Sequence, residues 1–182
     1  MGKVLLLDLD DVCACHNERW VERFYEKTGI LLDREEWSSW DLHEVYSESI
    51  TKSLYEILQE PGFFRYLQPK SGCVEGVRTL YEVGFEIVFV TASPPTALYE
   101  KYEWIEEYFP FISKSNIVLT QRKDLVYGDI LVDDGPHNLL RSPAKTKIVF
   151  DHAYNRHLQQ FQRVKDWNEL VRILRDYMEV GA

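Results

Sequence analysis

The sequence predicts a doubly wound α/β fold, in which helices cover both faces of a parallel sheet. Residues 4–7 are four consecutive aliphatic residues, a run that suits a strand buried on both faces. From residue 69 onward, short apolar runs alternate with stretches of helical spacing. Strands that alternate with helices favour right-handed crossovers and therefore a parallel sheet.

Length and charge limit the class of protein. The chain has 182 residues and a net charge of −9, which suits one domain that carries an insertion and argues against a nucleic-acid polymer as partner. Small phosphorylated substrates remain compatible, because a local cation can outweigh distant negative charge. No stretch approaches the roughly 18 apolar residues of a membrane span. Residues 1–3 lead directly into the first strand, so we expect no signal peptide, and three sparse cysteines favour a reducing cytoplasm.

The elements follow in order from the spacing of apolar residues. After the first strand, residues 16–68 have helical spacing, with Trp20 and Phe24 on successive turns, and they contain ten aromatic side chains. This predicts a helical insert whose aromatic groups either stack on a planar ligand or form an ordinary core. The later elements are a helix at 74–83 closed by Gly84, a strand at 85–90, a helix at 99–109 after two prolines, strands at 117–119, 130–132 and 148–150, and a last helix from a capping box at 166–169.

Polar side chains gather where these strands end. The groups concerned are Asp8 and Asp10, Thr91 with Ala92 and Ser93, Arg122 and Lys123, Asp133 and Asp134, and Asp151 with His152. Each group alone has a structural explanation, such as a helix cap or a solvated turn. Because all of them follow the carboxyl ends of strands, where such sheets bind ligands, we expect a shared site.

The residue types fit phosphoryl transfer. Asp8 is the candidate nucleophile that forms an aspartyl phosphate, and Asp10 the candidate general acid and base. Asp8 and Asp134 are candidate ligands of Mg²⁺, which prefers carboxylate oxygens, waters and substrate phosphate. Lys123 would offset charge on the transferred group. Thr91, Ala92 and Ser93 would supply neutral donors to the phosphate, and Asp133 would orient Lys123 or a bound water. A soft-metal site at Cys13, Cys15 and His16 is the weaker alternative, because no second Cys or His cluster completes it.

The order of these motifs resembles a known superfamily. Asp-x-Asp-x-Val at residues 8–12, a strand that ends in Thr91, Lys123 in a loop and the Asp133-Asp134 pair are similar to the haloacid dehalogenase superfamily, and within it to the 5'(3')-deoxyribonucleotidases. The resemblance implies strand order 5-4-1-2-3, a core of residues 1–15 and 69–182, and a helical cap of residues 16–68. It also implies a Mg²⁺-dependent 5'-nucleotidase that hydrolyses (deoxy)ribonucleoside monophosphates, in which Asp10 adds a backbone carbonyl to the metal, and a homodimer.

Several positions depart from the family pattern. Asp11 stands where human-type enzymes have Gly, and we assign it no role. His16 stands where they have a Phe that stacks on the base, and with Trp40 and Phe64 it is a candidate contact for the base. Gln121 stands in place of a phosphate-contacting Arg, for which Arg122 is the candidate substitute. Leu58 falls where a pocket Trp is expected, and the aromatic segment 37–40 aligns poorly.

Three alternatives remain. A phosphoacceptor receiver module combines the same residue types, but it needs its acceptor Asp at the end of the middle strand, where this chain has Thr91. A phosphatase of the same superfamily could act on another small phosphorylated metabolite. A binding protein without catalysis could retain the fold, although intact motifs disfavour it.

Overall fold

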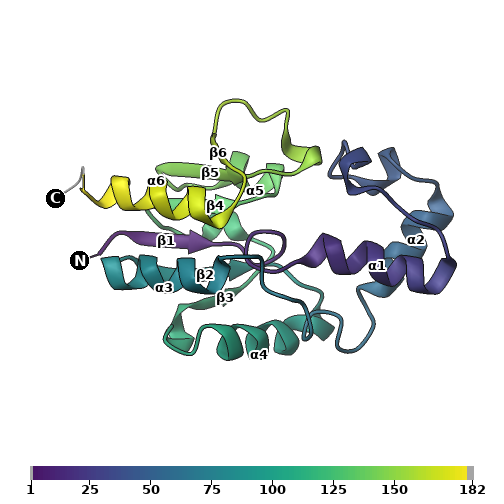
Figure 1. The fold of residues 1–182 in the computed structure, drawn as a ribbon, viewed down its shortest axis with the longest axis horizontal. Helices are drawn as coiled ribbons and strands as arrows, with labels where there is room; N and C mark the ends of the chain where they lie inside the picture. Colours follow the sequence, from purple (N-terminus) through teal and green to yellow (C-terminus); the bar gives the residue numbers. More distant parts are fainter. Residues whose placement is uncertain (1, 180–182) are drawn as a thin grey trace.

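The structure is a computed structural model that describes residues 2–179. Met1, one of the residues on which the expectation about a signal peptide rests, lies outside the described residues. The centre of the structure is one six-stranded sheet in the order β3-β2-β1-β4-β5-β6, and every neighbouring pair is parallel (Figure 1). The strands are β1 (Val4–Leu7), β2 (Glu86–Thr91), β3 (Ile117–Leu119), β4 (Ile130–Asp133), β5 (Thr146–Phe150) and β6 (Gln162–Val164). The predicted α/β class and order of the first five strands are confirmed.

The sixth strand, β6, was not predicted. It has three residues, of which two are polar, and only Val164 is buried. It pairs with β5 at the edge of the sheet, where half of a strand can remain in water. An edge strand this short and polar has no apolar run from which it could be recognised.

Both faces of the central strand are buried, as the run at 4–7 predicts. Leu5 and Leu7 belong to the larger apolar cluster, which includes residues of α3 (Cys73–Val83), α4 (Leu98–Tyr108) and α6 (Trp167–Glu179). Leu6 points to the opposite face and packs in a second cluster with Leu139 of α5 (Pro136–Arg141). The alternation of side chains along a strand thus supplies two separate cores.

The predicted helix boundaries are close to those observed. Gly84 ends α3 in the left-handed conformation at φ 105°, which favours glycine. Two prolines lead into a 3-10 turn, Pro95–Ala97, before α4 begins. At the start of α6, Asp166 accepts a hydrogen bond from the backbone N–H of Glu169 at 2.9 Å. Among residues 2–179, no helix is both long and apolar enough to cross a bilayer.

The segment 16–68 is helical, as predicted. It contains α1 (His16–Thr28), α2 (Glu48–Ile57) and two 3-10 turns, Arg34–Glu36 and Leu42–Glu44. Figure 1 shows α1 and α2 side by side beyond the carboxyl end of β1. Trp20 of α1 donates a hydrogen bond from Nε1 to the carbonyl of Leu54 in α2 at 2.7 Å. The remaining 3-10 turns are Lys114–Asn116, Lys123–Leu125 and Ala153–Asn155.

Candidate functional site

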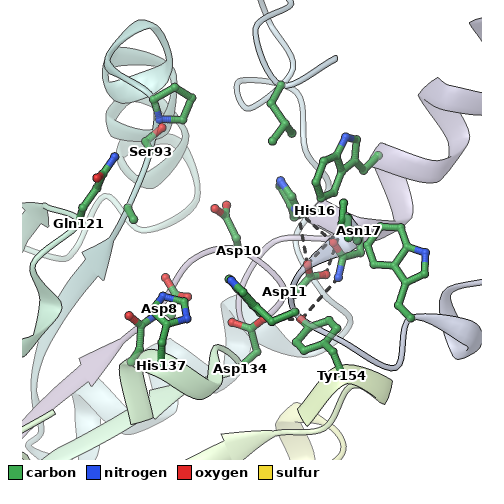
Figure 2. A pocket seen from close by; sticks show the side chains of 18 of the residues that line it. Asp8, Asp10, Asp11, His16, Asn17, Ser93, Gln121, Asp134, His137 and Tyr154 are labelled. Atoms are coloured by element: carbon green, nitrogen blue, oxygen red, sulfur yellow. Dashed lines mark hydrogen bonds and ion pairs between the residues drawn. The ribbon is translucent and has the colours of Figure 1, made fainter. Parts of the chain in front are cut away.

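A cavity of about 470 Å³ lies between the carboxyl ends of the strands and the helical segment 16–68. It lies at the point where the strand order reverses, beside β1 and β4, which is the usual place for a ligand in such a sheet. From the core side it is lined by Asp8, Asp10, Ala92, Ser93, Gln121, Lys123, Asp134 and His137, and from the helical segment by His16, Asn17, Trp20, Trp37, Trp40, Tyr55, Leu58 and Phe64. Most of the predicted site residues therefore meet around one space (Figure 2).

Asp8 lines the cavity beside the ammonium group of Lys123. Its Oδ1 atom is 2.6 Å from Nζ of Lys123 and accepts a hydrogen bond from the backbone N–H of Leu9 at 2.7 Å. Lys123 also donates to Oδ2 of Asp133 at 2.9 Å, and Asp133 is fully buried. Asp133 thus contacts Lys123, and its predicted role in orienting that lysine stays a prediction. Within residues 2–179, Oδ2 of Asp8 has no hydrogen-bond partner, which leaves that oxygen available to a ligand.

The protonation of Asp8 is set by burial. Burial raises the pKa of Asp8 to about 7, although Lys123 opposes the shift, and the nearby carboxylates of Asp133 and Asp10 raise it further. The pKa of Lys123 is raised above its usual value because the attraction of Asp133 and Asp8 outweighs the effect of burial. A bound cation would favour the ionised form of Asp8.

The pKa of Asp8 predicts how stability depends on pH. Between pH 4 and about 7 this carboxyl is ionised in the unfolded chain but still protonated in the folded one, so the folded state binds more protons. The unfolding free energy of the metal-free protein should therefore fall as pH rises through this window. Denaturant unfolding in chelator measures the unfolding free energy at pH 5 and at pH 7.5. The decrease in this free energy between the two pH values should be smaller for Asp8→Asn than for the parent. An equal decrease in both would contradict the raised pKa.

Asp10 has a cationic partner that sequence reasoning missed. Nζ of Lys101, a fully buried residue of α4, donates to Oδ2 of Asp10 at 2.5 Å, to Oγ1 of Thr91 at 3.0 Å and to the carbonyl of Ala92 at 2.6 Å. Oδ1 of Asp10 is buried and unpaired among the described residues, and Figure 2 shows this carboxyl group facing the open part of the cavity. A lysine on the same helix face as Trp104 and Ile105 was the signal available in the sequence.

The structure does not place two of the predicted phosphate contacts, Thr91 and Arg122, in the lining of the cavity. Thr91 does not line the cavity, because it is fully buried and its Oγ1 accepts from Lys101. Arg122 points away, since its exposed guanidinium forms a two-bond pair with Asp124 at 2.8 and 2.7 Å. Ala92 and Ser93 do line the cavity, and Oγ of Ser93 is a buried hydroxyl without a partner among the described residues. Gln121 occupies the place expected for Arg122.

A group of buried carboxylates is suited to a hard cation. Asp8, Asp133 and Asp134 each offer an oxygen within 4.8 Å of the others. Both oxygens of Asp133 are already occupied by Lys123, Asn138 and the backbone N–H of Gly135, whereas Asp134 has one oxygen bonded by Tyr154 and one open. Burial, followed by the charge of Asp8, raises the pKa of Asp134 well above its usual value. The open oxygens of Asp8 and Asp134 could therefore hold a hard cation. Within residues 2–179, no comparable group includes Cys13 or Cys15.

The wall opposite the carboxylates is aromatic. The ring of His16 stacks on Phe64 at 5.7 Å between centroids and lies 5.2 Å from Trp20. Trp40 lies at the mouth of the cavity, where its ring is 4.9 Å from His137 and 5.3 Å from Tyr154. The three predicted base contacts, His16, Trp40 and Phe64, thus all line the cavity. Leu58 also lines it, at the position where a Trp was expected.

Asp11, unassigned from the sequence, holds the start of α1. Its backbone adopts the left-handed conformation at φ 56°, where glycine is favoured. Its carboxylate accepts from the backbone N–H of Asn17 at 3.1 and 3.2 Å and lies 3.4 Å from Nδ1 of His16 and 3.6 Å from Nζ of Lys70. The pKa of Asp11 is held below its usual range because the hydrogen bond with His16 and the charge of Lys70 outweigh burial. The interactions of this carboxylate stabilise the helix start and its neighbours.

The sequence of the chain is similar to those of one family of nucleotidases. The family model for "5' nucleotidase, deoxy (Pyrimidine), cytosolic type C protein" matches residues 2–177. The chain is 34% identical to a 5'(3')-deoxyribonucleotidase of Clostridium acetobutylicum over 94% of its length and 96% of that protein. It is also 34% identical to the 5'(3')-deoxyribonucleotidase of Bacillus subtilis, over 96% of its length and 99% of that protein.

Solved structures confirm the fold. An HAD family hydrolase from Deinococcus radiodurans, with bound phosphate and sodium, aligns with a TM-score of 0.63 at 14% identity and covers 96% of each chain. The HAD-hydrolase YfnB from Bacillus subtilis, bound to magnesium, aligns with a TM-score of 0.57 at 14% identity over 95% of this chain and 98% of that one. The similarity covers the core and the helical segment together. The chain therefore has the fold of the HAD hydrolases and belongs to the 5'(3')-deoxyribonucleotidase family of phosphoric monoester hydrolases.

Proposed function

We propose that the protein is a Mg²⁺-dependent phosphomonoesterase that hydrolyses deoxyribonucleoside monophosphates through an aspartyl phosphate on Asp8. One observation carries this proposal: a carboxylate beside Lys123 faces, across one cavity of about 470 Å³, an aromatic wall suited to a planar base. Family membership supports the substrate class.

In the first step, an oxygen of Asp8 attacks phosphorus and the bond to the ester oxygen breaks. The proton on Asp10 passes to the departing alkoxide, which leaves as the nucleoside. In the second step, Asp10 takes a proton from water as that water attacks phosphorus, so the bond to Asp8 breaks and inorganic phosphate is released. Oδ1 of Asp10 is not bonded to Lys101 and has no partner among the described residues, which supports its assignment to both transfers.

The surrounding groups stabilise the transferred phosphoryl. Lys123 carries positive charge beside Asp8, and the unpartnered hydroxyl of Ser93 supplies a neutral donor. Asp8 and Asp134 would hold Mg²⁺, with the backbone carbonyl of Asp10 as a further oxygen. The cation would supply charge that offsets the repulsion between Asp8 and the substrate phosphate.

Residues 16–68 are proposed to act as a cap on a core of residues 1–15 and 69–182. The two chain crossings between these parts are bonded to each other, through the N–H of Cys15 to the carbonyl of Gln68 at 2.8 Å and the N–H of Lys70 to that of Cys13 at 2.7 Å. Trp40, His16 and Phe64 bring aromatic surface from the cap over the cavity. A cap of this kind excludes water from the bond that breaks.

His16→Phe tests the contact with the base. The variant keeps a ring against Phe64 and removes both ring nitrogens: Nε2, which has no protein partner in the described chain, and Nδ1, which lies near Asp11 and Asn17. We expect the ratio of kcat/KM between pyrimidine and purine deoxynucleotides to change by about three- to tenfold, the size of one hydrogen bond. Steady-state kinetics on four 5'-deoxynucleotides measures it. A ratio equal to that of the parent would show that His16 does not contact the base.

A substrate panel tests the function as a whole. Deoxyribo- and ribonucleoside 5'- and 3'-monophosphates and sugar phosphates would be assayed with Mg²⁺ and with chelator. We expect turnover of the deoxynucleotides that chelator abolishes and added Mg²⁺ restores. Full turnover in chelator would contradict the metal, and Mg²⁺-dependent turnover confined to sugar phosphates would favour the alternative of a phosphatase for another metabolite.

Two further expectations belong to this proposal. The family description, "cytosolic type C", and the three free cysteines support a cytoplasmic protein without disulfides. The homodimer expected from the resemblance stays a prediction, for which sedimentation of the purified protein is the test.

A further inference from the structure

A series of hydrogen bonds connects the candidate metal ligand Asp134, through Tyr154, to two side chains of the helix α1, Asn17 and His16. The hydroxyl of Tyr154 donates a short hydrogen bond to Oδ2 of Asp134, and Nδ2 of Asn17 donates to Oη of Tyr154 at 3.5 Å. Oδ1 of Asn17 lies 3.2 Å from Nδ1 of His16. Figure 2 shows Asn17 between His16 and Tyr154, with Asp134 beyond the tyrosine hydroxyl. All four residues are less than a tenth exposed.

The direction of each hydrogen bond follows from the chemistry of the groups. The amide nitrogen of Asn17 can only donate, so the oxygen of Tyr154 accepts from it and directs its own hydrogen to Asp134. The amide oxygen of Asn17 can only accept, and Nδ1 of His16 lies between this oxygen and the carboxylate of Asp11, so Nδ1 carries a hydrogen. The series thus runs from the ring of His16 through Asn17 and Tyr154 and ends on the carboxylate of Asp134.

Tyr154 is important to Asp134 because this carboxylate lacks other support. Within residues 2–179, no Lys or Arg pairs with the carboxylate of Asp134, and Tyr154 makes its only hydrogen bond. The bond occupies Oδ2 and leaves Oδ1 open beside Asp8. The ring of Tyr154 is itself held by two neighbouring rings. It stacks on His152 with 5.3 Å between the ring centroids and 8° between the ring planes, and it makes an edge contact with Trp40 with 5.3 Å between the centroids.

We propose that Tyr154 is a positioning residue that fixes Asp134 for Mg²⁺, and that Asn17 of the cap helix holds Tyr154 in place. The metal site would then be completed from the cap as well as from the core. This inference rests on the proposed Mg²⁺-dependent function. Hydrogen-bond partners that orient a metal ligand typically contribute about 10- to 100-fold to metal affinity.

Direct metal binding by Tyr154→Phe tests this role without turnover. The variant keeps the ring between His152 and Trp40 and removes only the hydroxyl. Calorimetric titration with Mg²⁺, repeated with Mn²⁺ by electron paramagnetic resonance, should give a Kd about 10- to 100-fold above that of the parent. In kinetics, the Mg²⁺ concentration for half activation should rise, while kcat at saturating Mg²⁺ should recover toward the parent value. Tyr127→Phe, at a 79% exposed tyrosine, should change neither quantity.

Asn17→Ala provides a second variant if Tyr154→Phe fails to fold. It leaves Tyr154 in contact with Asp134 but removes the amide that holds its hydroxyl, so we expect a smaller rise in the Kd for Mg²⁺, of about two- to tenfold. If Tyr154→Phe folds, a Kd for Mg²⁺ equal to that of the parent would overturn the inference. If only Asn17→Ala folds, a parent-like Kd for Mg²⁺ in that variant would overturn it. Either result would leave the proposed function intact. Failure of the parent itself to bind Mg²⁺ would instead contradict the proposed function.

Discussion

Asp8→Asn should abolish turnover while the protein remains folded. The amide has nearly the shape of the carboxylate and can still accept from Lys123 and from the N–H of Leu9, so the fold should persist. It cannot act as a nucleophile toward phosphorus, and we expect kcat to fall by roughly 10⁴-fold or more. Removing a buried carboxyl of raised pKa should also leave the metal-free protein at least as stable near pH 8.

The control for this variant is Asp176→Asn, which removes a carboxylate from an exposed position on α6. Both proteins would be compared by circular dichroism, by thermal unfolding and by phosphate release. Asp176→Asn should match the parent in all three. Turnover by a folded Asp8→Asn within tenfold of the parent would contradict the assignment of Asp8 as nucleophile.

Asp10→Asn should have the second largest effect, because it removes the group that transfers the proton. We expect kcat to fall by about 10²- to 10⁴-fold, the usual contribution of general acid and base catalysis. The amide can no longer form an ion pair with Lys101, which then remains buried beside Thr91 and Ala92. Lys101→Met should therefore also slow turnover, since it leaves Asp10 without its partner and removes the ammonium group that lies 4.7 Å from the ring centroid of Phe64.

Substrates with different leaving groups distinguish proton transfer from a general disturbance. An aryl phosphate such as p-nitrophenyl phosphate leaves as a stable anion and needs no proton, so Asp10→Asn should slow the first step less with it than with a nucleotide. Pre-steady-state release of nitrophenol from the variant measures that step. An equal loss with both substrates would mean that Asp10 does not act as the general acid.

Much of the fold could be predicted because buried strands have long apolar runs. The run at 4–7 and the runs that became β2, β4 and β5 each lie in a parallel sheet covered on both faces. The strand β6 escaped prediction because an edge strand needs few apolar residues. Strand ends of a parallel sheet share one edge, and for this reason Asp8, Asp10, Lys123 and Asp134 could be grouped before their distances were known.

The rest of the site depends on packing that the sequence does not encode locally. Lys101 reaches Asp10 from the middle of a helix, and Tyr154 reaches Asp134 from a turn after β5. Neither lies in a strand-end motif. Arg122 and Gln121 are neighbours in sequence, yet only Gln121 lines the cavity, because Asp124 pairs with the guanidinium of Arg122 outside it. Asp11 has a local role at the start of α1 that became visible only with its left-handed backbone.

Trapping of the covalent intermediate tests the central claim most directly. Protein that is turning over a deoxyribonucleoside monophosphate with Mg²⁺ would be quenched in acid, reduced with borohydride and analysed by peptide mass spectrometry. An acyl phosphate on Asp8 would be reduced to the alcohol, so the account predicts homoserine at position 8 in the parent and none in Asp8→Asn. Turnover in the parent with position 8 unmodified, or with the phosphoryl group on another residue, would contradict it.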